Sequence, residues 1–120
     1  MIFDDTRPIS GQLVEYGYSR IMAGEWPPGG RIPSTKDLAV QLGVNPRTVM
    51  KAYDELSDDG IIYQKRGLGY FTADNARELI LENRRKAFVN RTVPALIKTM
   101  DELGISPEDL MNIIITHIRK

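Results

Sequence analysis

The side chains best suited to bind nucleic acid lie at the start of a predicted helix. Arg47 and Lys51 are one helical turn apart, and about 100° per residue places both opposite the apolar face. Arginine can pair bidentately with a guanine edge, whereas short polar side chains reach a phosphate or a base. The candidate contacts on this helix are Asn45, Arg47, Thr48 and Lys51. Because turn residues and a basic hairpin accompany them, this pattern favours DNA contact over an ordinary solvated helix face.

Charge is unevenly distributed along a chain whose formal net charge is zero. Residues 31–51 carry four cationic side chains against one acid, and residues 60–73 carry Lys65 and Arg66 against none. On charge alone this could be ordinary solvated surface. Asp54 and Asp58 continue the outward face of the predicted helix, where phosphates would repel their carboxylates. We therefore expect only the first two turns of this helix to enter a DNA groove.

Cap and turn residues predict a helix-turn-helix that would position these side chains. Ser34 is the expected N-cap of a short helix, and Gly43 supplies its left-handed stop. Asn45 then caps a second helix, Pro46 takes its first position, and Gly60 ends it. A short helix, a tight turn and a well-capped second helix are typical of this motif.

The sequence predicts a helix before this motif and a β-hairpin after it. Apolar residues at helical spacing cover residues 9–23, although Gly17 stands where this face would carry another apolar side chain. Residues 61–65 and 70–72 are rich in β-formers and flank a turn at 66–69. The order helix, helix, helix, hairpin places the hairpin where a winged helix carries its wing.

Helical patterns fill the rest of the chain. A composition change near residues 73–75 predicts a domain boundary, with a winged helix-turn-helix domain over 1–74 and a helical tail over 75–120. The expected fold class is thus α+β, mostly α. Pro94 predicts a kink or a restart near Thr92. Ser106 and Pro107 then start a last helix, which runs to about residue 118.

Apolar faces on the tail predict a homodimer. A stripe at helical spacing runs through Val89, Val93, Leu96, Met100 and Leu103. The last helix has an apolar arc of roughly 200°, about twice what packing on one neighbour requires. One side can cover the stripe in its own chain, and the other would be exposed on a monomer. The expected interface residues are Val89, Val93, Leu96, Leu110, Ile114, Ile115 and Ile118.

Several classes of function are disfavoured. The absence of cysteine excludes a thiol nucleophile and a thiolate metal site, and His117 has no pattern of metal ligands beside it. Gly67 and Gly69 lack the P-loop context, and no Gly-x-Ser-x-Gly elbow exists. We therefore expect no enzyme, no cofactor and no metal. Apolar runs of only a few residues, and an N-terminus without a basic or apolar leader, predict a soluble cytoplasmic protein.

A series of motifs, in order and spacing, resembles the GntR-type winged-helix repressors. They are Ile32–Ala39, Leu42–Val49, Ala52-Tyr53, Gly60–Ile62 and the Lys65–Phe71 hairpin, with Pro8, Ile9 and Gln12 ahead of them. The resemblance covers about residues 8–73, and the short tail is similar to that of the YtrA-like branch, whose members dimerise through a small helical unit. It implies bacterial transcription regulation, commonly of transporter genes beside the regulator's own gene.

The resemblance also implies contact residues. Carried over position by position, base and phosphate contacts fall on Lys36, Arg47, Thr48, Arg66 and Gly67. This sequence has Lys36 where the family usually has arginine, and lysine cannot make a bidentate fork. It also has Met50 where arginine is common. Arg47, at a position often small and polar in this branch, would take up part of the base reading.

The principal hypothesis is a homodimeric repressor that binds double-stranded DNA at an inverted repeat. Its candidate DNA-binding residues are Lys36, Asn45, Arg47, Thr48, Lys51, Lys65, Arg66 and Gly67. The alternative is a winged-helix module for protein–protein contact, with Lys36 and Met50 as signs of an altered DNA face; a small hydrolase is a distant third. A small-molecule effector would have to use a cleft in or between the tails. Steep salt dependence of duplex binding would favour the repressor.

Overall fold

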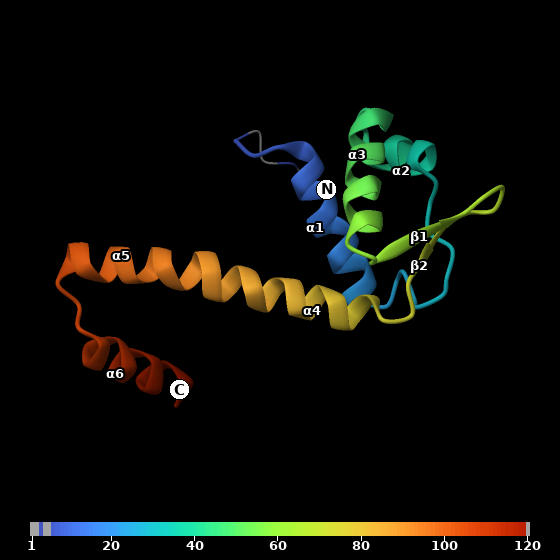
Figure 1. Cartoon of the computed structure of the whole chain (residues 1–120). Coiled ribbons are helices and arrows are strands. Elements are labelled where there is room, and N and C mark those ends of the chain that lie inside the picture. The colour runs from blue at the N-terminus through green and yellow to red at the C-terminus, as the bar shows by residue number, and fades with distance from the viewer. Residues whose placement is uncertain (1–2, 4–5, 120) are drawn as a thin grey trace. The chain divides into compact units, whose positions relative to one another are not determined.

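The computed structural model describes residue 3 and residues 6–119 (Figure 1). Residues 1–2, 4–5 and 120 lie outside the described residues. Most of the N-terminal segment from which we predict the absence of a leader sequence therefore lies outside them too. The chain forms two compact units, Met1–Glu82 and Asn83–Lys120. The first unit continues past the composition change near residue 74, because Ala76 and Ile80 are buried in its core. The functional division at that point stays a prediction.

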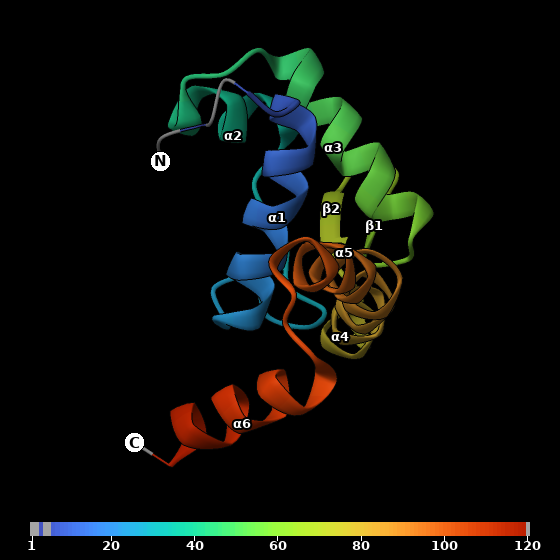
Figure 2. The same cartoon turned by 90° about the vertical axis from the view of Figure 1, so that its left-hand side faces the viewer.

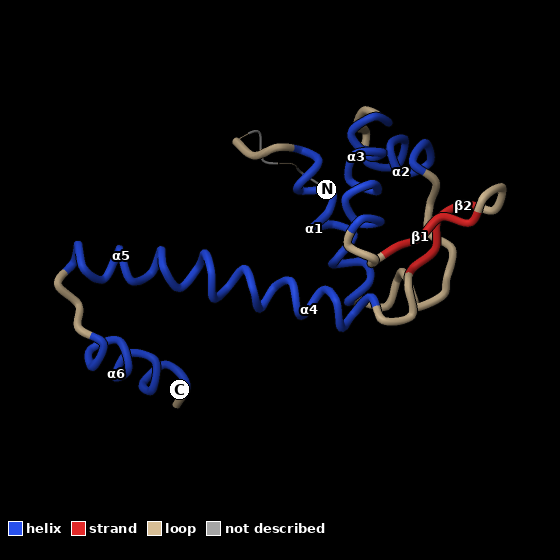
Figure 3. Tube along the Cα trace, viewed as in Figure 1, coloured by secondary structure: helices blue, strands red, loops and turns tan. Residues whose placement is uncertain are grey.

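The first unit is a winged helix (Figures 1 and 3). Its elements are α1 (Ile9–Met22), α2 (Thr35–Leu42), α3 (Pro46–Asp58), β1 (Ile62–Lys65), β2 (Gly69–Thr72) and the start of α4 (Ala76–Ala87). β1 and β2 pair antiparallel, with Ile62 opposite Thr72 and Lys65 opposite Gly69. An isolated bridge between Arg31 and Phe71 adds a short third segment. The predicted fold class is confirmed.

Side-chain caps fix the helix-turn-helix where the sequence places it. The Asp37 backbone N–H donates to Ser34 Oγ at 3.0 Å at the start of α2. Gly43 ends α2 with φ of 68°, a left-handed conformation that favours glycine. The Arg47 backbone N–H donates to Asn45 Oδ1 at 2.9 Å at the start of α3. These bonds satisfy amide donors that a helix start leaves unpaired, and so they define both N-termini.

Gly17 lets α1 and α3 approach closely. A Cβ atom at this position would lie 3.1 Å from Leu56 Cδ1 and 3.4 Å from Trp26 Cζ3. Gly17, Leu56 and Trp26 are all buried. The apolar face of α1 therefore has a gap at residue 17 because a side chain from α3 fills that space. Packing between the helices, which the sequence of α1 does not reveal, explains the departure from the apolar pattern.

The second unit contains a π-helical segment and two α-helices. The π-helix η1 (Phe88–Thr92) leads into α5 (Val93–Leu103), and α6 (Pro107–Ile118) follows. The Val93 N–H donates to the Phe88 carbonyl, one residue further back than in an α-helix. Pro94 follows directly and has no N–H to continue the α-helical ladder. The predicted restart near Thr92 is therefore the end of a π-helix.

The apolar faces of the second unit remain open to solvent. Met100 is buried, but Val89, Leu96 and Leu103 on the same predicted stripe are exposed. No residue of α6 is buried. Figure 2 shows α6 as a separate helix joined to α5 by a short loop. The prediction that one side of the last helix covers this stripe in its own chain is wrong for most of its length. Most of the apolar side chains of α5 and α6 are thus exposed in the single chain.

Candidate nucleic-acid interface

Helix α3 separates a buried apolar face from an exposed basic one. Val49 and Tyr53 are buried in the core, whereas Arg47, Met50 and Lys51 are exposed. Asn45 is exposed at the cap and Thr48 is half-buried beside it. The structure therefore brings the sequence-predicted residues of this helix to one end of it. At that end, backbone N–H groups and two cations favour the approach of an anion.

The exposed face of α3 changes sign along its length. Asp54 and Asp58 are exposed on the last two turns, beyond Lys51. A phosphate backbone would be attracted to the first half of the face and repelled from the second. The helix can thus approach DNA with its N-terminal half only.

Lys36 lies in the first turn of α2, exposed and one residue beyond the first residue of that helix. Helices α2 and α3 pack against each other, so both belong to one rigid motif. Figure 1 shows the two helices side by side, with the β-hairpin extending beside them. Lys36, Arg47 and the hairpin thus belong to the same compact unit.

The wing turn is tightly built. The Leu68 N–H donates to the Lys65 carbonyl at 2.9 Å, and Gly67 has φ of 79°, which favours glycine. Arg66 occupies this turn and is exposed. Lys65 Nζ lies 4.9 Å from the centre of the Phe71 ring, in cation–π geometry. Lys65 therefore lies over the outer face of the hairpin, whereas Arg66 lies in the turn itself.

Arg31 is a further cation at the wing that the sequence analysis did not place there. It bridges to Phe71, and its Nε lies 3.2 Å from where a Cβ atom of Gly69 would be. Gly69 therefore leaves room for the Arg31 guanidinium against β2. The available signal was the extended residue pair Arg31-Ile32, but a single pair does not reveal which strand it joins.

Tyr53 ties α3 to the segment before α2. Its hydroxyl donates to the Pro33 carbonyl at 2.7 Å, and its ring lies 5.0 Å from that of Tyr70 on β2. Burial raises the pKa of the Tyr53 hydroxyl above its usual value, because the ionised form would lose its hydration. One side chain thus links α3, the turn into α2 and the wing.

Replacing this hydroxyl is expected to destabilise the first unit. Tyr53→Phe leaves the Pro33 carbonyl without this donor and should lower the free energy of unfolding by about 1–3 kcal/mol in denaturant titrations. Because the folded pKa is raised, the neutral phenol's contribution is complete below pH ~10 and is lost at higher pH. The wild-type chain should therefore lose stability above that pH more steeply than Tyr53→Phe. The exposed Tyr63→Phe is the control, and an equal loss in both variants would contradict the assignment.

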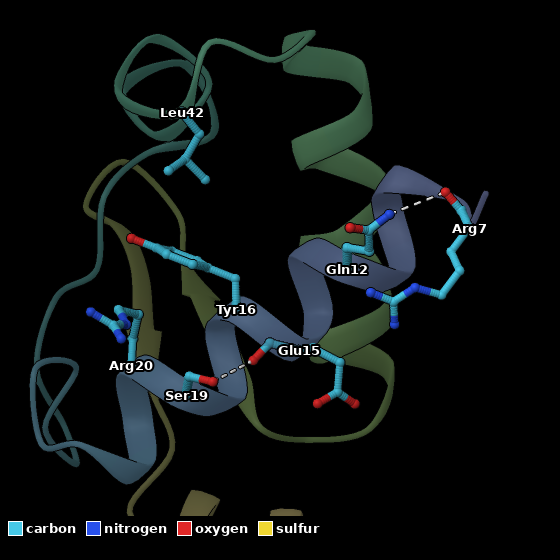
Figure 4. A pocket seen from close by; sticks show the side chains of 7 residues that line it. All are labelled: Arg7, Gln12, Glu15, Tyr16, Ser19, Arg20 and Leu42. Atoms are coloured by element: carbon cyan, nitrogen blue, oxygen red, sulfur yellow. Dashed lines mark hydrogen bonds between the residues drawn. The ribbon is translucent and has the colours of Figure 1, made fainter. Parts of the chain in front are cut away.

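Two cavities are lined by residues outside the candidate DNA-binding set. The larger, of about 550 Å³, lies between α1 and the end of α2 (Figure 4) and is lined by Arg7, Gln12, Glu15, Tyr16, Ser19, Arg20 and Leu42. Within it Arg20 pairs with Glu25 at 2.6 Å and lies 5.3 Å over the Tyr16 ring. The smaller, of about 330 Å³, lies on α6 and is lined by Asn112, Ile113, Thr116 and His117. The larger cavity is therefore in the first unit, whereas the sequence analysis expected an effector cleft in the tail.

The predicted interface residues of the tail are distributed over η1, α5 and α6. Val93 and Leu110 are half-buried. The exposed members of the predicted set are Val89, Leu96, Ile114, Ile115 and Ile118. Within the described part of the chain, no three His, Cys, Asp or Glu side chains could together hold a metal ion. No helix over those same residues is long and apolar enough to span a membrane.

Known proteins resemble both units of the chain. Residues 12–71 match the model of bacterial regulatory proteins, gntR family. The chain is 32% identical over 103 residues to the HTH-type transcriptional repressor YtrA of Bacillus subtilis, and the alignment covers 86% of this chain and 78% of YtrA.

Some solved structures resemble nearly the whole chain, and others resemble only part of it. A GntR family transcriptional regulator from Listeria monocytogenes superposes with a TM-score of 0.74 at 32% identity, over 95% of this chain and 98% of that one. The DNA-binding domain of AraR in complex with operator ORR3 superposes with a TM-score of 0.54 at 32% identity. That match covers 61% of this chain and 88% of the AraR domain.

Proposed function

Because this chain belongs to the gntR family of bacterial regulatory proteins, we propose that it is a transcriptional repressor that binds an inverted-repeat operator as a homodimer. The family consists of transcriptional regulators and is not an enzyme class. The similarity to YtrA agrees with the predicted YtrA-like branch. The repressor assignment follows that relative, and we place the protein in the cytoplasm, where its DNA partner lies.

The observation that carries the proposal is the division of charge on α3. Arg47 and Lys51 are exposed on the first two turns, and Asp54 and Asp58 follow on the last two. This order suits a helix that presents its N-terminal residues to base edges. The cations at the wing then contact phosphates or the minor groove beside it. We assign DNA contact to Lys36, Asn45, Arg47, Thr48, Lys51, Lys65, Arg66 and Gly67, as the sequence predicts, and add Arg31.

The homodimer is supported by the unpartnered apolar faces of the second unit. Large exposed apolar surfaces on a small protein mark sites of association. Two-fold pairing would cover these faces and set two recognition helices on one palindromic duplex. The exposed apolar side chains of this unit are Phe88, Val89, Leu96, Ile97, Leu103, Met111, Ile113, Ile114, Ile115 and Ile118.

Salt dependence tests the proposal against the protein-contact alternative. The wild-type protein is first used to select a binding sequence from a pool of duplexes with a randomised centre. We call the sequence obtained the selected duplex. Its binding should weaken linearly, on logarithmic scales, with rising salt, and it should bind far more tightly than a scrambled duplex. A protein–protein interaction module would bind both duplexes equally weakly. That result would contradict the proposed function.

Arg66→Ala is expected to weaken binding with a clear salt signature. Loss of one phosphate contact in each half-site should reduce the slope of log affinity against log salt by about 2 for the dimer, about 1 for each contact. The affinity loss is therefore larger at low salt than at high salt, and electrophoretic shifts at several salt concentrations measure it. Arg119→Ala removes a cation from the second unit and serves as the control. An unchanged slope in Arg66→Ala would exclude a phosphate contact at this residue.

A further inference from the structure

Met50 is an exposed apolar side chain on the basic face of α3. It is 50% exposed, whereas Val49 beside it is fully buried. Its neighbours on the outward face are Arg47, three residues before it, and Lys51. No contact within the chain buries this thioether side chain fully, and its exposure to water is unfavourable. Because Met50 lies within the proposed DNA-binding surface, an apolar group of the DNA could cover it.

The position of Met50 along the helix defines what it can reach. Three residues advance about 4.5 Å along a helix axis, and successive base pairs are about 3.4 Å apart. If Arg47 faces one base pair in the major groove, Met50 faces the next one. It also precedes Asp54, so it lies within the half of α3 that phosphates do not repel.

We propose that Met50 reads the 5-methyl group of a thymine in the base pair next to the one contacted by Arg47. The methyl group of thymine is the apolar feature of the major-groove edge. A methionine side chain is flexible and polarisable, so it can pack against such a group without fixed geometry. Arg47 thus recognises a hydrogen-bonding edge, and Met50 recognises an apolar one. This inference rests on the proposed function.

Deoxyuridine tests the inference at the level of one methyl group. It differs from thymidine only in lacking that group, so the hydrogen-bonding groups of the base are unchanged. In the selected duplex, replacing the thymine beside the Arg47 contact should weaken wild-type binding about fourfold when one half-site is changed and about 15-fold when both are changed. The same replacement at a thymine outside the half-sites should have no effect.

Protein variants assign the methyl contact to Met50. Met50→Ala should bind the thymine and deoxyuridine duplexes equally, because the partner of the methyl group is gone. Leu81→Ala removes an exposed apolar side chain from α4 and should keep the full sensitivity of the wild type.

Three results would overturn the inference. They are a selected duplex without a thymine at this place, a wild-type protein insensitive to deoxyuridine, and a Met50→Ala variant that stays sensitive. In each of them the wild type still selects a specific duplex, so the proposed function stands. A wild type that selects no duplex overturns the proposed function and this inference with it.

Discussion

A chain carrying both Ile114→Lys and Ile115→Lys is expected to be monomeric and to bind DNA weakly. These side chains are 41% and 39% exposed on α6 in the single chain. In a two-fold dimer both lie at or beside the interface, so the variant would bury ammonium groups without partners. An uncompensated buried charge costs about 3–5 kcal/mol, which is enough to abolish pairing at tens of micromolar. Sedimentation velocity measures the loss directly.

The control for this variant adds a lysine to the opposite face of α6. Thr116→Lys places an ammonium group on the polar side of the same helix and should remain dimeric. DNA binding by the double variant should fall as well, because a single recognition helix contacts only half of a palindromic site. A wild-type chain that is already monomeric at tens of micromolar would contradict the dimer.

Arg47→Ala should cost about 1–3 kcal/mol of binding free energy and relax specificity at one position in each half-site. The start of α3 should be unaffected, because the cap bond to Asn45 uses the backbone N–H of residue 47. The loss therefore reports the guanidinium and not the fold. Competition between the selected duplex and its single-base variants measures both the affinity and the relaxed position.

Lys51→Ala is the matched control for Arg47→Ala. It removes a cation from the same face of α3, and a phosphate contact there would weaken binding about equally for all sequences. If Arg47→Ala kept the specificity and the affinity of the wild type, Arg47 would not contact a base.

Local signals in the sequence predict most of the first unit. Ser34, Gly43 and Asn45 act through hydrogen bonds and backbone conformations within a few residues of themselves, so their spacing alone defines α2, the turn and α3. The hairpin is similar, because the wing turn is closed between Lys65 and Leu68. For such elements the sequence pattern and the structure agree to within a residue or two.

Contacts between distant residues were not predictable from these patterns. Gly17 is explained by Leu56 on another helix, and Arg31 is placed at the wing by Phe71, forty residues later. In the tail, η1 disturbs the count of about 100° per residue on which the predicted stripe depends. Within α5 itself, Met100 is buried whereas Leu96, one turn earlier on the same face, is exposed, and the periodic pattern does not predict this difference.

The most direct test of a dimer on an inverted repeat is sedimentation of the complex on the selected duplex and on the same duplex with one half-site scrambled. We predict two chains on the intact duplex, and a large loss of affinity when one half-site is scrambled, because both recognition helices contribute to binding. One chain on the intact duplex, with equal affinity for the scrambled one, would contradict the account.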